Sequence, residues 1–177
     1  SIERSAEESY EFAFFRALVQ YAFPGGPHGS VIYETPPNLN VLREGQPPSN
    51  TLSFTSMVVN SETVNTYLAQ IYYSMDPRYI VASPYTFAFF SPAGELIAMG
   101  SREIKPFTIE LLDVKRTISA GMLESCRDRG DGLICLNYVG LSTHGVMIPL
   151  ILNVEQKSGG VSVEHTHPAQ HYSCFAR

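Results

Sequence analysis

The chain has 177 residues, of which 44% are hydrophobic and 16% are charged. This composition is typical of one globular domain with its own core, and it excludes a disordered chain. The net charge of -5 leaves no basic stripe that could release counterions from phosphates, so we expect no nucleic-acid partner.

The first predicted element is a helix over residues 2–23, because apolar side chains recur every four residues along it. The Pro-Gly-Gly-Pro segment at 24–27 ends this helix. No obvious N-cap precedes it and the chain opens without Met, so we expect a piece cut from a longer protein. The repeat consists of Ile2, Ala6, Tyr10, Phe14, Leu18 and Ala22.

A second helix is predicted over residues 60–75, after a strand at 30–34, a Pro-rich loop at 35–50 and a strand at 51–59. Asn60 or Ser61 is suited to cap its N-terminus. Its apolar residues share one helical face: Val64, Leu68, Ile71, Tyr72 and Met75.

The period then changes to that of strands, which we expect to pair through short turns such as residues 91–94. The predicted strands are 78–82, 85–90, 95–99, 107–111, 132–140, 144–154 and 161–164, with a helix at 113–126. We therefore expect one α+β domain with a mostly antiparallel sheet. It would consist of the long helix 2–23, a mixed core 30–164 and a tail 165–177.

The tail holds His165, His167, His171 and Cys174. Imidazole and thiolate are the preferred ligands of zinc, and four of them complete a tetrahedron. The tail therefore suggests a zinc site, with a solvated tail as the alternative, because Pro168 interrupts the strand that would align the first two histidines. Its His-Thr-His-Pro segment resembles the core motif of JAMM metalloproteases. That family also needs a later Asp ligand, and no Asp follows Asp131.

Cys126 and Cys135 flank a segment rich in turn residues, so a disulfide between them is expected, with two buried thiols as the alternative. Such a bond would close a loop of about ten residues and would favour an oxidising compartment. The same segment contains Arg129-Gly130-Asp131, the tripeptide that integrins recognise. The turn alone also accounts for the Asp and the Gly.

No nucleophile elbow, phosphate-binding loop or metalloprotease helix motif is present, so the sequence favours a role other than catalysis. Ser142 and His144 are two residues apart, which fits a polar turn better than a catalytic triad. Aromatic residues cluster in the middle third, mostly as core, with a small-molecule pocket as the alternative. The candidate ligand-binding residues are Tyr73, Arg78, Tyr79, Tyr85 and Phe87.

The segment IYYSMDPRYIVASPYTFAFFSPAGELIAMGS, with the long helix before it, resembles extracytoplasmic PAS-like sensor domains of the PDC or Cache type. The resemblance implies a periplasmic or cell-surface module, anchored by membrane spans and joined to a cytoplasmic output domain outside this sequence. It implies a small-molecule ligand, no cofactor, and allows a homodimer. The alternatives are a small zinc-dependent hydrolase or metal-binding protein, with zinc as cofactor, and an adhesion module that presents the Arg129–Asp131 loop.

Overall fold

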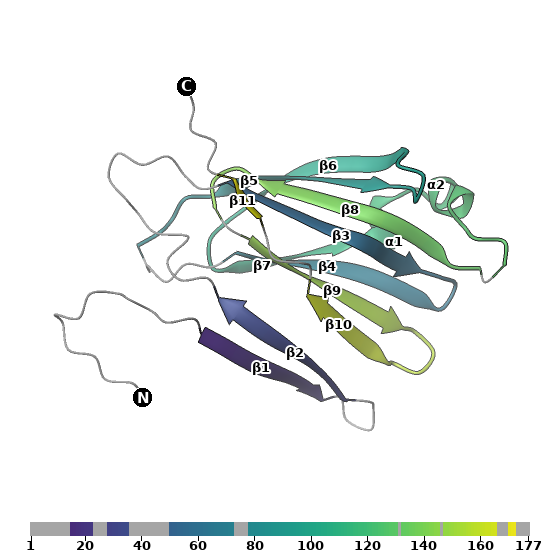
Figure 1. Cartoon of the computed structure of the whole chain (residues 1–177), viewed down its shortest axis with the longest axis horizontal. Helices are drawn as coiled ribbons and strands as arrows, with labels where there is room; N and C mark the ends of the chain where they lie inside the picture. The colour runs from purple at the N-terminus through teal and green to yellow at the C-terminus, as the bar shows by residue number, and fades with distance from the viewer. Residues whose placement is uncertain are drawn as a thin grey trace.

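The structure, a computed structural model, describes residues 15–22, 28–35, 50–72, 78–130, 132–145, 147–165 and 170–172. Within these ranges the chain is built almost wholly of strands (Figure 1). The strands are β1 (Phe15–Ala22), β2 (His28–Thr35), β3 (Asn50–Asn60), β4 (Val64–Tyr72), β5 (Ser83–Phe90), β6 (Leu96–Ile104), β7 (Thr108–Asp113), β8 (Ile134–Ser142), β9 (Met147–Glu155), β10 (Val161–His165) and β11 (Gln170–Tyr172); the helices are α1 (Val114–Thr117) and α2 (Ala120–Ser125).

Two antiparallel sheets face each other as a sandwich (Figure 1). The five-stranded sheet has the order β11-β3-β8-β5-β6, and the four-stranded sheet has the order β10-β9-β4-β7. The chain therefore passes from the five-stranded to the four-stranded sheet after β3, β6 and β8, and it returns after β4, β7 and β10. Strands β1 and β2 form a separate antiparallel hairpin, which lies beside β10.

The core lies between the two sheets and is rich in aromatic rings. Strand β5 alternates buried and exposed residues, so that Tyr85, Phe87 and Phe89 all face inward. The ring centroids of Phe87 and Phe89 are 6.1 Å apart, and those of Phe89 and Tyr138 are 5.6 Å apart. From the opposite sheet, Leu68 and other apolar side chains of β4 and β9 complete this core.

Polar bonds fix the first crossing between the sheets, from β3 to β4. The fully buried Asn60 accepts a hydrogen bond from the Thr66 amide through its side-chain oxygen, at 3.0 Å. The Ser61 hydroxyl oxygen accepts bonds from the amides of Thr63 and Val64. This is the side-chain-to-backbone bonding that makes such residues good turn formers, and here it starts a strand, not a helix.

The long N-terminal helix predicted over residues 2–23 is wrong where the structure describes it, because residues 15–22 are strand β1. The error has a simple cause: a spacing of four places side chains on one face of a helix, and also on one face of a strand, since four is a multiple of two. Residues 1–14 and 23 lie outside the described part of the chain.

The helix predicted over residues 60–75 is also wrong, because Val64–Tyr72 is the central strand β4. Both faces of β4 carry buried residues: Leu68 is 0% exposed on the inner face, and Ala69 is 5% exposed on the outer one. A strand buried on both sides loses the alternation of apolar and polar residues, and its spacing then matches a helix.

The α+β fold class is therefore corrected to a β-sandwich, and a PAS-like layout with a long packed helix is excluded. The helix predicted at 113–126 is two short helices, each begun by its own N-cap: Asp113 bonds the Arg116 amide and Ser119 bonds the Met122 amide. The strand predicted over residues 78–82 is wrong, because these residues form a turn and irregular chain. The remaining predicted strands are present with shifted ends, and their antiparallel pairing agrees with the expectation.

We predict that Leu68→Ala lowers the free energy of unfolding by about 2–5 kcal/mol, because it leaves a cavity in a core that cannot collapse around it. Ile80→Ala is the matched control, since Ile80 is 82% exposed and its truncation should change the value by less than about 0.5 kcal/mol. Urea unfolding of the two variants measures this difference. Equal losses would contradict the assignment of β4 to the core.

Candidate functional site

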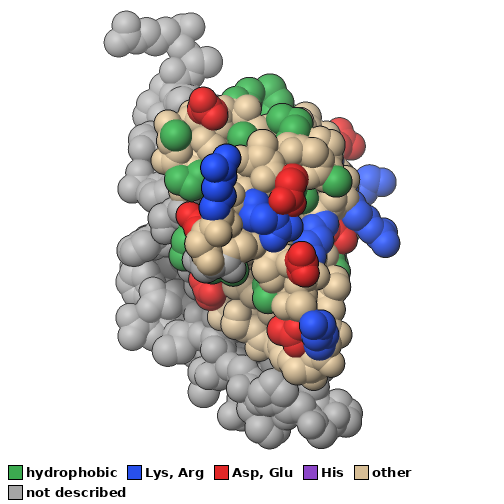
Figure 2. All heavy atoms as spheres, turned by 90° about the vertical axis from the view of Figure 1, so that its right-hand side faces the viewer, with side chains coloured by type: hydrophobic (Ala, Val, Ile, Leu, Met, Phe, Trp, Pro, Cys, Tyr) green, Lys and Arg blue, Asp and Glu red, His purple; other side chains and the backbone are tan. Residues whose placement is uncertain are grey.

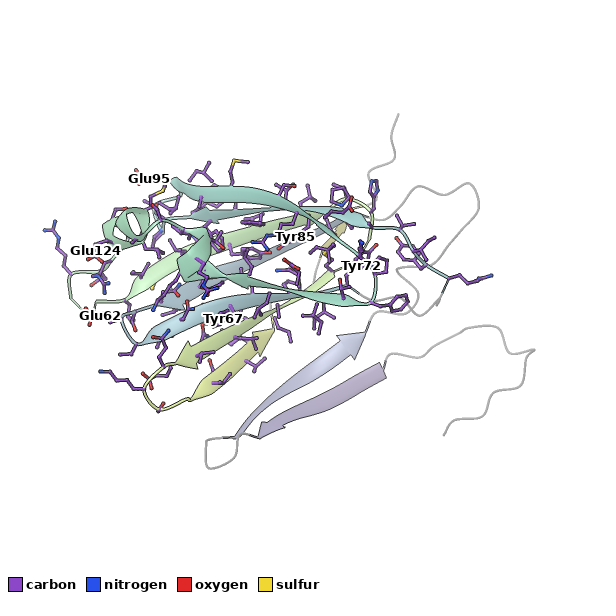
Figure 3. The ribbon with its side chains drawn as sticks, turned by 180° about the vertical axis from the view of Figure 1, so that it is seen from behind. Glu62, Tyr67, Tyr72, Tyr85, Glu95 and Glu124 are labelled. Carbon is purple, nitrogen blue, oxygen red and sulfur yellow. The ribbon has the colours of Figure 1, made fainter. Side chains whose placement is uncertain are left out.

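One end of the sandwich holds a cluster of tyrosine hydroxyls around the carbonyl oxygen of His144. The Tyr79 hydroxyl donates to this carbonyl at 2.5 Å, and the Tyr72 hydroxyl lies 3.0 Å from it. Tyr72 also reaches the Val81 carbonyl at 2.7 Å. Figure 3 shows Tyr72 near this end of the molecule, with Tyr85 further along the space between the sheets. The cluster therefore ties β4 to residues 79–82 and to the turn after β8.

The turn at 142–145 is positioned by bonds to the start of β5. The Thr143 amide donates to the Pro84 carbonyl at 3.1 Å, and the His144 amide donates to the Ser83 hydroxyl at 3.1 Å. Gly145 permits the close approach of Tyr72, because a Cβ at this position would overlap the phenol hydroxyl.

Ser142 and His144 do not form a nucleophile–base pair in this turn. The Ser142 hydroxyl donates to the Gly145 carbonyl, so its proton is directed at the backbone. The Nδ1 atom of His144 is buried and has no hydrogen-bond partner. Catalysis by an activated serine needs the hydroxyl within reach of the imidazole. The arrangement fits the polar turn that the sequence indicated.

A second polar group lies deeper between the sheets. The Gln70 side-chain amide donates to the Tyr138 hydroxyl at 3.0 Å, and both residues are at most 1% exposed. The Tyr85 hydroxyl lies beside them without a partner. A Cβ on Gly140 would overlap the hydroxyls of both Tyr138 and Tyr85, so a glycine in β8 makes room for the pair.

Burial controls the protonation of these tyrosines. Desolvation raises the pKa of Tyr138 far above its ordinary value of 10.0. Desolvation, and then the neighbouring Tyr79, raise the pKa of Tyr72 in the same direction. A phenol with a raised pKa stays protonated near neutral pH, so these groups donate and accept hydrogen bonds and do not act as bases.

The residues predicted to bind a ligand lie in different parts of the structure. Tyr85 and Phe87 lie together in the core, with ring centroids 6.0 Å apart, whereas Tyr79 belongs to the cluster around His144. Arg78 is exposed, and Tyr73 lies outside the described residues. Sequence reasoning missed Gln70 and Tyr138; a glutamine and a tyrosine within apolar strands are the only signal that could have marked them.

Cys126 and Cys135 form no disulfide with each other in the structure. Cys126 ends α2 and packs against the core, while Cys135 lies on β8 between the core-facing Ile134 and Leu136. The chain segments that carry Cys126 and Cys135 run side by side next to the bridge between Arg127 and Ile134. Their pairing therefore stays a prediction.

The predicted zinc ligands lie largely outside the described part of the chain. The backbone of His165 ends β10 in the four-stranded sheet, and that of His171 lies in β11 in the five-stranded sheet. His167 and Cys174 are not described. The described residues contain no group of three or more His, Cys, Asp or Glu side chains that could hold a metal ion.

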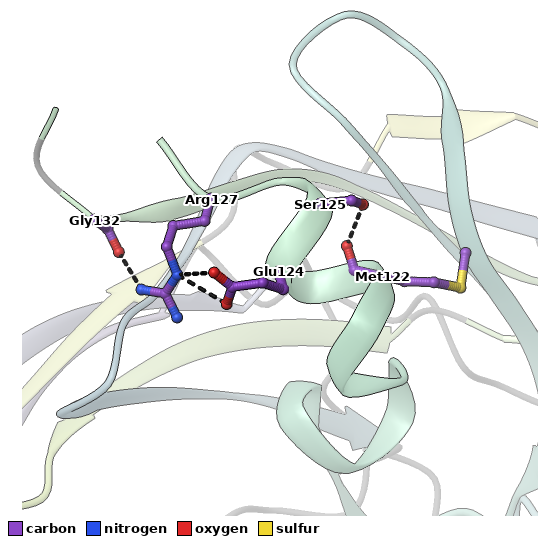
Figure 4. A network of polar contacts seen from close by, with 5 residues as sticks. All are labelled: Met122, Glu124, Ser125, Arg127 and Gly132. Atoms are coloured by element: carbon purple, nitrogen blue, oxygen red, sulfur yellow. Dashed lines mark hydrogen bonds and ion pairs between the residues drawn. The ribbon is translucent and has the colours of Figure 1, made fainter. Parts of the chain in front are cut away.

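The described residues on both sides of Asp131 form a hydrogen-bonded loop between α2 and β8. The Asp128 amide donates to the Leu133 carbonyl at 2.7 Å, and the Gly132 amide donates to the Asp128 carbonyl at 3.1 Å. Arg127 clamps the loop, because its guanidinium bonds the Gly132 carbonyl at 2.8 Å and the Glu124 carboxylate at 2.8 and 2.9 Å (Figure 4). Arg129 and Gly130 are exposed on this loop; Asp131 lies outside the described residues.

Comparison with known proteins adds no assignment: no protein-family model, no curated protein and no solved structure matches this chain. Among the described residues, neither helix has the length and hydropathy of a membrane span.

We predict that the free energy of unfolding falls as the pH rises above about 10, where the unfolded chain loses the Tyr138 proton that the folded chain retains. Because the folded pKa is raised, this contribution is complete below pH 10 and decreases above it, by up to about 1.4 kcal/mol per pH unit. Urea unfolding between pH 9 and pH 11 should show a shallower fall for Tyr138→Phe. Identical slopes for the two proteins would contradict the raised pKa.

Proposed function

We propose that this chain is a protein-binding module, not an enzyme, and that it presents the loop Arg127–Leu133 to a receptor that recognises Arg-Gly-Asp. The observation that carries the proposal is the geometry of this loop: it is closed by backbone bonds, clamped by Arg127, and exposes Arg129 and Gly130. Loops fixed on a rigid sandwich are a common way for β-proteins to bind partners.

The clamp lowers the entropic cost of binding. An unconstrained tripeptide loses backbone freedom when a receptor orders it, and that loss reduces its affinity. Here the Asp128 carboxylate also accepts a bond from the Gly130 amide at 2.6 Å, which fixes the backbone inside the tripeptide itself. The described part of the loop is therefore ordered before a receptor binds, and its exposed Arg129 side chain is available to pair with a carboxylate.

The chemistry of the partner follows from the segment Arg129–Asp131. A receptor for it needs an acidic pocket for the guanidinium and a bound cation or cationic side chain for the carboxylate of Asp131. On the face shown in Figure 2, which includes the α2 end of the sandwich, basic and acidic side chains are interspersed. Recognition on this face therefore depends on individually positioned charged side chains, not on an electrostatic field of one sign.

The sensor hypothesis keeps less support. It required a long helix packed on a sheet, and residues 15–22 are a strand. Two of its proposed ligand-binding residues, Tyr85 and Phe87, are at most 4% exposed and serve as core. An extracytoplasmic sensor role, its membrane anchor and its small-molecule ligand stay untested predictions. The adhesion proposal itself implies a secreted or cell-surface location.

We predict that Asp131→Glu weakens binding to Arg-Gly-Asp-recognising integrin ectodomains by roughly 30-fold or more, the loss typical of a hot-spot residue. Surface plasmon resonance with divalent cation present would measure the affinity. Arg127→Gln should weaken binding by a few-fold to about tenfold, mostly through faster dissociation, because it releases the clamp without changing the tripeptide.

Arg116→Ala is the matched control, since it removes an exposed arginine that pairs with Asp113, away from the loop. Its affinity should equal that of the wild type. Binding that survives Asp131→Glu, or no binding by the wild-type chain to any such receptor, would remove the proposal.

A further inference from the structure

Three polar side chains converge in the middle of the core, where the two sheets meet. Gln70 from β4 is 1% exposed, Tyr85 from β5 is 2% exposed, and Tyr138 from β8 is 0% exposed. The hydroxyls of both tyrosines crowd the same backbone position, Gly140. Tyr138 in turn bonds the Gln70 amide at 3.0 Å. The Tyr138 hydroxyl therefore stands between polar groups of two other strands, the Gln70 amide and the Tyr85 hydroxyl.

The hydrogen bonds at this point do not balance within the protein. The Gln70 side-chain oxygen and the Tyr85 hydroxyl are buried and have no partner. Turning the amide over does not remove the problem, because one of its two ends bonds Tyr138 and the other stays without a bond. Buried polar groups in native proteins are bonded in the great majority of cases, since an unmet one costs much of its hydration free energy.

Three polar cross-strand neighbours of Tyr85 and Gln70 already have bonds elsewhere. Ser142 is the cross-strand neighbour of Tyr85, and its hydroxyl donates to the Gly145 carbonyl. On the other side of Tyr85, Arg102 is paired with Glu110 at 2.6 Å. Glu110 is itself the cross-strand neighbour of Gln70. Both flanks of the buried group are therefore occupied by bonds that point elsewhere.

We propose that one water molecule binds between the two sheets, donating to the Gln70 side-chain oxygen and bonding the Tyr85 hydroxyl beside Tyr138. Water fits these requirements because it both donates and accepts, and because internal waters usually make about three bonds to such groups. An ion would meet only neutral groups here, in a low dielectric that penalises charge. The Arg102–Glu110 pair lies at the rim, on the side where β6 and β7 form the sheet edges.

Tyr85→Phe tests the proposal through the sign of its effect. If a water meets the hydroxyl, removing the hydroxyl loses a bond, and the midpoint of thermal unfolding should fall by about 2–4 °C. If the hydroxyl were truly unpartnered, its removal would relieve a cost and the midpoint would rise. Tyr72→Phe is the matched control, because that hydroxyl bonds the Val81 carbonyl and its loss should lower the midpoint.

A high-resolution crystal structure of the wild-type chain gives the direct measurement. Electron density for a single water within hydrogen-bond distance of both the Gln70 oxygen and the Tyr85 hydroxyl supports the proposal. Density that shows no water at this point overturns it, as does a midpoint for Tyr85→Phe equal to or above that of the wild type.

Discussion

The burial of both faces of β4 is the constraint on which the sandwich depends. This strand pairs with β9 along its full length on one side and with β7 from Tyr67 to Tyr72 on the other. Its inner face carries Leu68, Gln70 and Tyr72 into the core, and all three are at most 1% exposed. An inner strand has no exposed edge, and its inward-facing side chains pack against the opposite sheet. The packing of the five-stranded sheet is set by them.

Filling this core with tyrosines brings hydroxyl groups into a place that is shielded from bulk solvent. The fold handles them in two ways. Near the end of the sandwich, Tyr72 and Tyr79 reach backbone carbonyls of the connecting segments, so the hydroxyls anchor irregular chain to the sheets. In the middle, the Tyr138 hydroxyl accepts its bond from the Gln70 side-chain amide of the opposite sheet. Carbonyls outside the ladders are free to accept such bonds, whereas those within paired strands are already used.

The sequence predicted the β5–β6 hairpin from two strand-like runs joined by turn residues, and the burial of β5 alternates as a strand requires: Pro84 and Thr86 are exposed, while Tyr85 and Phe87 are buried. The turn at 91–94 is also found, closed by a bond from the Gly94 amide to the Ser91 carbonyl at 2.9 Å. The same method failed for β4 because alternation requires one polar face, and β4 has none. The sandwich arrangement itself could not be read from the chain, since which strands share a sheet depends on crossings at corners.

The two proposed sites differ in how far sequence alone could reach them. The bonds of the Arg127–Leu133 loop join residues at most five apart, so Asp, Gly and Arg at these positions already predicted a turn, and a turn is found. Gln70 and Tyr138 are 68 positions apart, and neither has a local partner that would reveal its role. Hydrogen bonds between residues close in sequence limit the backbone conformations of a segment, and the residue types that form them can be recognised in the sequence. A buried polar group takes its partners from other strands, so its chemistry exists only once the sheets have assembled.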